Sequence, residues 1–383
     1  MRKIDYQQHN AEVQALWETY HRGAPMRVPM ILGVSTRYTT LGHEANPRNI
    51  TFEQYFNDPD IMLTRQLEHK SWVRHHVPQD MEMGLPEEGW QINVDFQNSY
   101  EAGWFGCPIR YFDDDTPDTQ LLLQDEDGKR MLFDQGIPDP FTGALMRRNW
   151  EFHDYFKRKQ EEGFTWQGRP IAAVSPVGLG TDGPLTVACN LRGASQIYTD
   201  LAADPDYARE LLRFITEATI TRIQAYRRRL GMPAKTVGHR LPDDAIQSIS
   251  AAMYRDLVMP FHRQLLEALS TGGPYTMHLC GDASRHFPLL RDELGVTSFD
   301  TGFPIDFGRV RQQVGPRVEI SGGPSVMFLQ TATPAQVREE VQRILASGIM
   351  EGGRFILREG NNLSPGIALE NLWAMYDAVR ELG

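Results

Sequence analysis

The chain is poor in cysteine and has no excess of positive charge. Three cysteines lie far apart among 383 residues, so they cannot form a disulfide framework. Free thiols in a reducing cytoplasm are therefore expected. The formal net charge of −11 argues against a nucleic-acid backbone as the partner. A neutral or cationic small molecule, or another protein, fits this charge better.

Long apolar runs are also missing. No stretch approaches the roughly 20 apolar residues that a membrane-spanning helix needs, so no membrane partner is expected. The start, MRKIDYQQHN, lacks the apolar core of a signal peptide. A hydrophobic content of 41% is ordinary for a globular chain and is enough for a sizeable core.

Short apolar runs bounded by turn residues predict strands, and helical patterns separate most of the later ones. Alternating strands and helices imply a parallel sheet. Eight such strands in one chain of this length predict a single α/β domain over 1–383, a closed (β/α)8 TIM barrel, with a doubly wound open sheet as the alternative. The predicted strands are 27–35, 91–96, 170–178, 235–241, 275–281, 296–302, 317–323 and 354–360.

Two further features complete the predicted organisation. The segment 10–23 has an apolar stripe at helical spacing and ends at a glycine, which predicts an N-terminal helical extension. The segment 101–150 is rich in turns, and Asp127-Gly128 lies between two apolar runs, which predicts a β-hairpin inserted into the barrel. Downstream, Ser250 is a possible helix N-cap, and Thr333 and Gln336 form a capping box.

The stretch YTMHLCG places His278 and Cys280 one residue apart in a predicted strand. Residues i and i+2 of a strand point to the same face, so the imidazole and the thiol point the same way. Both are metal ligands, and the pair predicts half of a zinc site. The alternative is a buried histidine beside a buried free cysteine.

Polar residues gather at several predicted strand ends, which in a barrel meet at one mouth. Adjacent carboxylates at 243 and 244 raise one another's pKa and could form an acid/base pair, or one of them could begin a helix. The candidates at the strand ends are Asp95, His239, Asp243, Asp244, Asp300, Glu359, Asn361 and Asn362.

Several stretches together resemble the uroporphyrinogen decarboxylase superfamily over nearly the whole chain. They include GPLTVACNLRG, HLCGDASRHFPLLRDELGVTSFD and GGRFILREGNNLSPGIALENLWAMYDAV. The resemblance implies a TIM barrel with its active site at the C-terminal ends of the strands, and a homodimer is common in this superfamily.

The decarboxylase branch carries an arginine-rich RQAGR loop after the first strand and a Gly-His-Gly pattern in the last loop. Here the first stretch reads MILGVSTRYTT, which retains only Arg37, and the second reads Gly360-Asn361-Asn362. These two departures argue against porphyrinogen decarboxylation.

The other branch, the cobamide-dependent methyltransferases, shares the His-x-Cys-Gly motif. The resemblance implies that His278 and Cys280 bind zinc together with a third ligand from the last loop. That ligand is a cysteine in the branch and Asn361 here, so Glu359 is the expected replacement, with Asp300 or Asp244 behind it. The chain has no Asp-x-His-x-x-Gly motif, so the corrinoid would be carried by a separate protein.

The resulting hypothesis is a zinc-dependent methyltransferase that exchanges a methyl group between a small methoxy, methylamine or methylthiol compound and a corrinoid protein. A metal-independent decarboxylase or lyase and a non-catalytic binding barrel are the alternatives. The expected catalytic residues are Asp243, Asp244 and Asp300, and the expected substrate-binding residues are Arg37, Tyr38, Asp95, His239 and Asn361.

Overall fold

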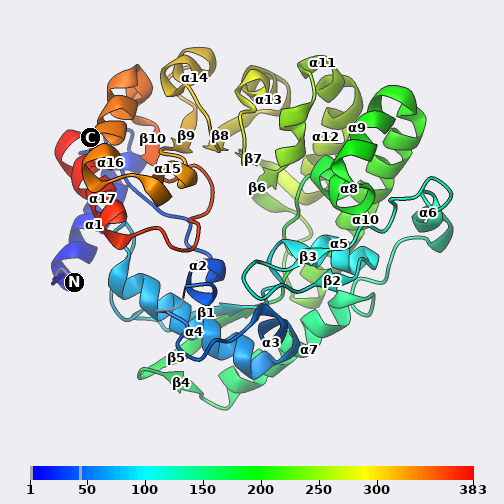
Figure 1. Ribbon diagram of the computed structural model, residues 1–383, viewed down its shortest axis with the longest axis horizontal. Helices are drawn as coiled ribbons and strands as arrows, with labels where there is room; N and C mark the ends of the chain where they lie inside the picture. The colour runs from blue at the N-terminus through cyan, green and yellow to red at the C-terminus, as the bar shows by residue number, and fades with distance from the viewer. Residues whose placement is uncertain (1–2, 43–44) are drawn as a thin grey trace.

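The computed structural model describes residues 3–42 and 45–383. Its strands form a ring that confirms the predicted barrel. One arc is a parallel five-stranded sheet in the order β10-β9-β8-β7-β6, and the opposite arc contains β1 and β5 (Figure 1). These strands are β1 (Trp90–Asn93), β5 (Arg169–Ser175), β6 (Thr236–Pro242), β7 (Ser270–Leu279), β8 (Val296–Thr301), β9 (Glu319–Gly322) and β10 (Phe355–Leu357).

The first predicted strand, 27–35, lies beside β10 at the edge of the five-stranded sheet, where one parallel bridge joins Met30 to Leu357. Ile31 N donates to Leu357 O at 3.0 Å, and Leu357 N donates to Pro29 O at 2.8 Å. On its other side this segment is not paired with β1. Instead, the side chain of Gln79 accepts the Leu32 N–H at 3.0 Å.

Helices surround the ring, and Figure 1 shows α12, α13 and α14 outside one arc and α4 and α7 outside the other. The α-helices are α1 (Tyr6–His21), α2 (Thr36–Thr40), α3 (Phe52–Asn57), α4 (Pro59–His76), α5 (Tyr100–Phe105), α6 (Met131–Gln135), α7 (Leu145–Glu161), α8 (Pro184–Arg192), α9 (Ala194–Ala203), α10 (Pro205–Arg229), α11 (Ala251–Met253), α12 (Met259–Leu269), α13 (Phe287–Leu294), α14 (Phe307–Val314), α15 (Val326–Thr331), α16 (Pro334–Ile344) and α17 (Leu369–Leu382).

The predicted helix caps are present. Ser250 accepts from Met253 N, and Thr333 and Gln336 form both hydrogen bonds of a capping box. The helix that begins at Ser250 is not continuous, however, because a π-helical turn over Tyr254–Val258 separates α11 from α12. Pro260 lies in the first turn of α12 and has no backbone N–H, so it cannot donate to the preceding turn.

The inserted hairpin is shorter than predicted and lies upstream of the Asp127-Gly128 turn. It pairs β2 (Ile109–Arg110) with β3 (Asp118–Thr119). The next apolar run does not pair as a strand, because Leu122 N and Leu123 N both donate to Leu191 O at the end of α8. The rest of the insertion is helical, with α5, α6 and the start of α7.

Two apolar clusters hold the fold together. The larger one lies between the strands and the helices of the long arc, and the smaller, largely aromatic one joins α3, α4 and α7 to β1 and β5. The N-terminal extension α1 packs beside α17, where Arg380 pairs with Glu12 at 2.9 Å. Within 3–42 and 45–383, no helix has the length and apolar character required to cross a membrane.

Candidate metal and active site

Three side chains converge where β6 and β7 end. One ligand atom from each of Asp244, His278 and Cys280 lies within 4.8 Å of the other two. His278 Nε2 and Cys280 Sγ are 3.3 Å apart, as expected for residues on one face of a strand. The third residue follows β6, whose Pro242 pairs with His278 in the parallel register.

Asp300 on β8 orients the imidazole of His278. The two residues are register partners, and His278 Nδ1 lies 2.7 Å from Asp300 Oδ2. Burial alone would raise the pKa of Asp300, but the hydrogen bond from His278 and the charges of Arg358 and Arg240 lower it to about 2. The ionised carboxylate can only accept, so Nδ1 carries the proton and Nε2 is directed toward Cys280.

The adjacent aspartates at the end of β6 have different surroundings. Asp244 Oδ1 accepts the backbone N–H of Cys280 at 2.7 Å. Asp243 is fully buried and turned to the first turn of α8, where it accepts from Leu185 N at 3.3 Å and Thr186 N at 2.9 Å. The two carboxylates therefore do not face each other as an acid/base pair. Asp243 instead lies at the N-terminus of α8, a helix that it does not itself begin.

The thiol of Cys280 lies in acidic surroundings. Burial, followed by the negative charges of Asp244 and Asp300, raises its pKa well above the ordinary value for cysteine. A bound cation would reverse this effect, because a coordinating thiol loses its proton.

The structure corrects the predicted third ligand. Glu359 is fully buried outside the cluster, where its carboxylate accepts Gly33 N at 3.0 Å and pairs with Arg358 at 2.8 Å. Asp244, which the sequence analysis ranked behind Glu359, is the carboxylate that lies in the cluster with His278 and Cys280. Asn361 Oδ1 lies 3.4 Å from Cys280 Sγ, and its φ of 99° is a left-handed conformation that favours glycine.

Arg37 and Asp95 are both held by Gln97. Arg37 Nε donates to Gln97 Oε1 at 2.7 Å, and Gln97 Nε2 donates to Asp95 Oδ2 at 2.6 Å. Asp95 also accepts from Thr36 and Tyr55, each at 2.8 Å. Burial lowers the pKa of Arg37, and the charge of Asp95 opposes this effect.

Two other predicted substrate-binding residues have different surroundings. Tyr38 is buried in the core, and its hydroxyl donates to Ile367 O at 2.6 Å. Its side chain therefore serves packing within the barrel wall. His239 is partly buried within β6, and its Nε2 has no hydrogen-bond partner among the described residues. Burial and the charge of Arg227 lower the pKa of His239 to about 4.

Sequence reasoning missed three charged residues at the site. Arg240 pairs with Asp300 at 3.2 Å, and Arg358 pairs with it at 2.8 Å. Arg240 lies two positions before Pro242 on β6, so strand alternation could have placed it on the inner face. The third is Asp182, where burial and the charges of Glu101 and Asp244 raise the pKa.

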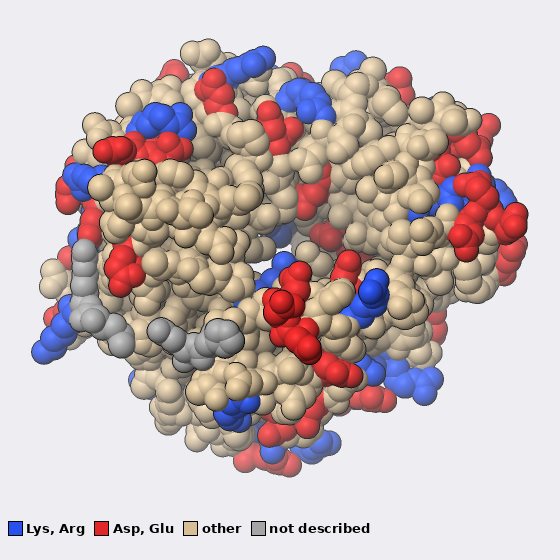
Figure 2. Space-filling view, in the orientation of Figure 1, with Lys and Arg blue, Asp and Glu red and all other residues tan. Residues whose placement is uncertain are grey.

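The donor set fits a zinc ion. Zinc takes imidazole nitrogen, thiolate sulfur and carboxylate oxygen, and catalytic sites use three protein ligands and keep a fourth position open. A histidine that binds zinc usually donates its other N–H to a carboxylate, as His278 does to Asp300. Figure 2 shows the molecule hollowed at the centre of the ring, with acidic side chains beside the opening.

Comparison with known proteins identifies the family of the chain. The family model described as Uroporphyrinogen decarboxylase (URO-D) matches residues 172–382. The chain belongs to this family. The matched residues run from β5 to α17 and include the whole Asp244, His278 and Cys280 cluster.

Two curated relatives in the family carry different names. A methylated-thiol–coenzyme M methyltransferase of Methanosarcina mazei is 30% identical over 204 residues, 52% of this chain and 51% of the relative. A uroporphyrinogen decarboxylase of Pseudomonas syringae pv. tomato is 27% identical over 140 residues, 35% of this chain and 38% of the relative. The chain thus spans about half the length, or less, of these relatives. The longer match, to the methyltransferase, agrees with the predicted branch.

A solved structure supports the barrel fold over the whole chain. A methyltransferase from Methanosarcina mazei superposes with a TM-score of 0.64 and covers 96% of this chain and 98% of its own. The sequence identity is 17%, so this likeness concerns the fold.

Proposed function

We propose that this chain is a zinc-dependent methyltransferase that exchanges a methyl group between a small methylated compound and a corrinoid carried by a separate protein. The observation that carries the proposal is the convergence of Asp244, His278 and Cys280, with Asp300 behind the histidine. Family membership adds support, because one matching relative is named as a methyltransferase.

His278, Cys280 and Asp244 would hold the zinc ion. When bound, it would act as a Lewis acid on the oxygen, nitrogen or sulfur atom that gives up or receives the methyl group. The name of the methyltransferase relative includes a methylated thiol, which makes methylated thiols the first substrates to test.

The surrounding residues fix the ligands. Asp300 holds His278 in the tautomer whose Nε2 is free, and Arg240 and Arg358 keep Asp300 ionised. The Cys280 N–H holds one oxygen of Asp244, so its other oxygen is available to the ion. Because these contacts are already formed, binding would cost little reorganisation.

Substrate binding is assigned to the polar groups beside the cluster. Arg37 and Asp95 offer opposite charges held in place by Gln97, and Asn361 offers an amide oxygen next to Cys280. A small polar methyl compound would therefore find both donors and acceptors. The corrinoid is assigned to a partner protein, because this chain contains no Asp-x-His-x-x-Gly motif.

The test is elemental analysis followed by a methyl-transfer assay. Protein purified without chelator should contain about one zinc per chain, and His278→Ala and Cys280→Ser should lose it. The loaded protein is then incubated with cob(I)alamin and methylated thiols, methylamines or methoxy-aromatics, and methylcobalamin is followed spectroscopically. Bound zinc without turnover on any of these donors would count against methyl transfer, and a wild-type protein that stays empty when offered zinc would count against the metal site.

A further inference from the structure

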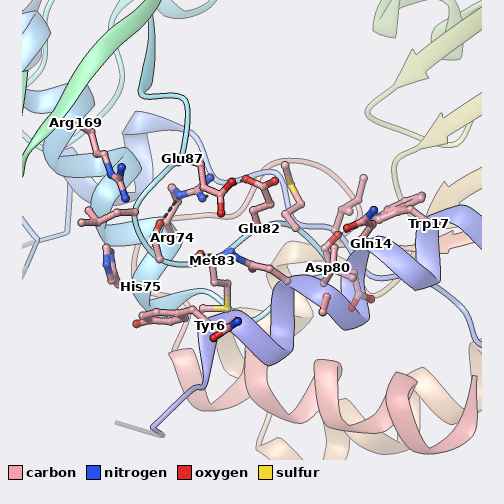
Figure 3. Close-up of a pocket in the computed structure, with 18 residues that line it drawn as sticks. Tyr6, Gln14, Trp17, Arg74, His75, Asp80, Glu82, Met83, Glu87 and Arg169 are labelled. Atoms are coloured by element: carbon pink, nitrogen blue, oxygen red, sulfur yellow. Dashed lines mark hydrogen bonds and ion pairs between the residues drawn. The ribbon is translucent and has the colours of Figure 1, made fainter.

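A second cavity lies in the barrel wall, between the first strand segment and β1. Its volume is about 680 Å³, and it shares no lining residue with the Asp244, His278 and Cys280 cluster. It adjoins a larger cavity of about 1260 Å³ beside α1, with which it shares Arg74, Met81, Glu82 and Glu87. Figure 3 shows the larger cavity, with Arg74, Glu82 and Glu87 where the two meet.

The smaller cavity exists because strand pairing does not join the two arcs of the barrel at this place. The segment around Leu32 and strand β1 exchange no ladder hydrogen bonds, and side-chain amides take the place of a partner strand. Gln79 accepts Leu32 N, and Gln66 Oε1 accepts Asn93 N at 3.3 Å. A gap without strand pairing leaves room for a pocket in the wall.

Lys70, on α4, lines this cavity without a counter-charge in contact. Among residues 3–42 and 45–383, no hydrogen bond or ion pair reaches its ammonium group, whereas Lys129 pairs with both Glu126 and Asp204. Burial lowers the pKa of Lys70, and Asp95 is the carboxylate that opposes this effect. Since Asp95 already accepts from three other side chains, the ammonium remains unpaired in a partly buried place.

A partly buried charge without a partner is unfavourable, and an anion would remove that cost. The lining also limits which anion fits. Leu32, Val34 and Val73 supply apolar walls, which suit an alkyl body. Glu82, Glu87 and Glu88 are exposed lining residues that repel any anion, and they repel a doubly charged phosphate about twice as strongly as a monocarboxylate, so a single negative charge is the most that the lining favours.

Arg74 is already engaged by protein groups. Its Nε donates to Gly84 O at 2.5 Å, and its Nη2 lies 3.5 Å from Glu82. His69, also in the lining, has both ring nitrogens occupied, by Thr39 Oγ1 at 3.0 Å and Val34 O at 3.1 Å. Among the described residues, Lys70 is therefore the lining cation to which no hydrogen bond or ion pair is already made.

We propose that this cavity binds a small organic monocarboxylate, with the carboxylate on Lys70 and the alkyl body against Leu32, Val34 and Val73. The volume falls within the range of about 300–1000 Å³ typical of small-molecule sites. The proposal is independent of methyl transfer and of zinc.

The test is calorimetric titration of the full chain with sodium hexanoate, and with 1-hexanol and inorganic phosphate as comparison ligands. The wild type should bind hexanoate and should bind hexanol and phosphate at least tenfold more weakly. Lys70→Met keeps most of the side-chain volume and should weaken hexanoate binding at least tenfold. Lys235→Met removes the same charge from an exposed position and should leave binding unchanged.

Three results would overturn the proposal. They are equal binding of hexanoate by Lys70→Met, binding of hexanol as tight as that of hexanoate, and preferential binding of phosphate. Failure of a folded wild type to bind hexanoate would overturn it as well. Thermal unfolding checks the fold of each variant, and Lys70→Gln replaces Lys70→Met if the latter does not fold; the comparison among the three ligands needs no variant.

Discussion

The backbone N–H of Cys280 donates a 2.7 Å hydrogen bond to Asp244 Oδ1, which fixes the carboxylate of one proposed metal ligand against the backbone of another. The preceding residue, Asp243, is turned away to α8 and His262. Substitutions at 243 and 244 should therefore have different consequences, the first for stability and the second for metal binding.

Asp244→Asn should weaken zinc binding with little effect on the fold. The amide keeps an oxygen for the Cys280 N–H but loses the charge that a zinc ligand supplies. We expect the zinc dissociation constant, measured by competition with a chromophoric chelator, to rise at least tenfold. Asp282→Asn, at an exposed position two residues beyond Cys280, is the matched control and should bind zinc as the wild type does. Wild-type affinity in Asp244→Asn would remove residue 244 from the ligand set.

Asp300→Asn should act through His278. The amide cannot reproduce the ionised acceptor that selects the Nδ1–H tautomer, and it loses the pairs with Arg240 and Arg358. Loss of such a carboxylate behind a metal-binding histidine costs about 10–100-fold in metal affinity.

The measurement for Asp300→Asn is zinc affinity combined with the histidine tautomer, which 15N NMR of labelled protein reports. A purely structural role for Asp300 would change stability but would leave the tautomer unaltered. An unchanged tautomer together with unchanged zinc affinity would contradict the proposed orienting role.

His262→Phe should destabilise the protein without removing a ligand. His262 Nε2–H donates to Asp243 Oδ2 at 2.7 Å and its Nδ1 accepts from the Tyr254 hydroxyl at 2.9 Å, and all three residues are fully buried. Removing the imidazole leaves the buried Asp243 carboxylate without one of its donors, which costs about 1.5–3 kcal/mol. Tyr254→Phe removes one neutral hydrogen bond and should cost about 1 kcal/mol.

Urea unfolding of the zinc-free protein measures both variants. If Tyr254→Phe proved as destabilising as His262→Phe, the His262–Asp243 bond would not be the main contact. Tyr254 is the first residue of the π-helical turn, which leads directly into α12, the helix that carries His262.

The barrel was predictable because its signals are local. Each strand is a short apolar run, and the alternation of side chains along a strand places His278 beside Cys280 whatever the neighbouring strands do. The position of Asp244 next to Cys280 depends on the parallel register of β6 with β7, where Pro242 pairs with His278. Sequence spacing does not specify that register. Glu359 was therefore preferred because it lies near Asn361 in the last loop, although Asp244 is the carboxylate that lies next to Cys280 in the structure.

Other errors have the same origin. Tyr38 was predicted to bind substrate, but α2 turns its side chain into the core against Trp72. The expected hairpin turn at Asp127-Gly128 fails because the apolar run before it hydrogen-bonds to the end of α8, a contact across about 70 residues. Local patterns cannot report contacts of this range.

Acid should destabilise the protein through His239. Burial lowers its folded pKa to about 4, below the ordinary value of 6.5 that applies to the unfolded chain. The unfolded state therefore binds more protons between pH 6.5 and 4, and the free energy of unfolding falls as the pH falls through that window. The part of this loss that is due to His239 should be about 1–3 kcal/mol. Burial also lowers the pKa of His69 and of His286, so His239→Gln should reduce the slope of the curve without removing it.

Unfolding by urea at intervals from pH 7.5 to 4 measures this dependence. His21→Gln, at an exposed histidine on α1, serves as the control and should retain the wild-type curve. If His239→Gln also kept the wild-type pH dependence, burial of the neutral His239 side chain would not be a cause of the acid destabilisation.

Gly302→Ala should displace the backbone that carries Cys280 and so disturb the proposed metal site. A Cβ built at this position overlaps the carbonyl oxygen of Cys280, which belongs to the backbone and cannot rotate away. The strand end that carries Cys280 must then move, at a cost typical of overpacking, about 1–3 kcal/mol, and the ligand geometry moves with it. We expect lower stability and weaker zinc binding together.

Gly180→Ala is the matched control, because a Cβ there has no heavy atom within 4 Å, and it should change neither property. Normal zinc affinity in a destabilised Gly302→Ala protein would show that the position of the Cys280 carbonyl does not govern the metal site.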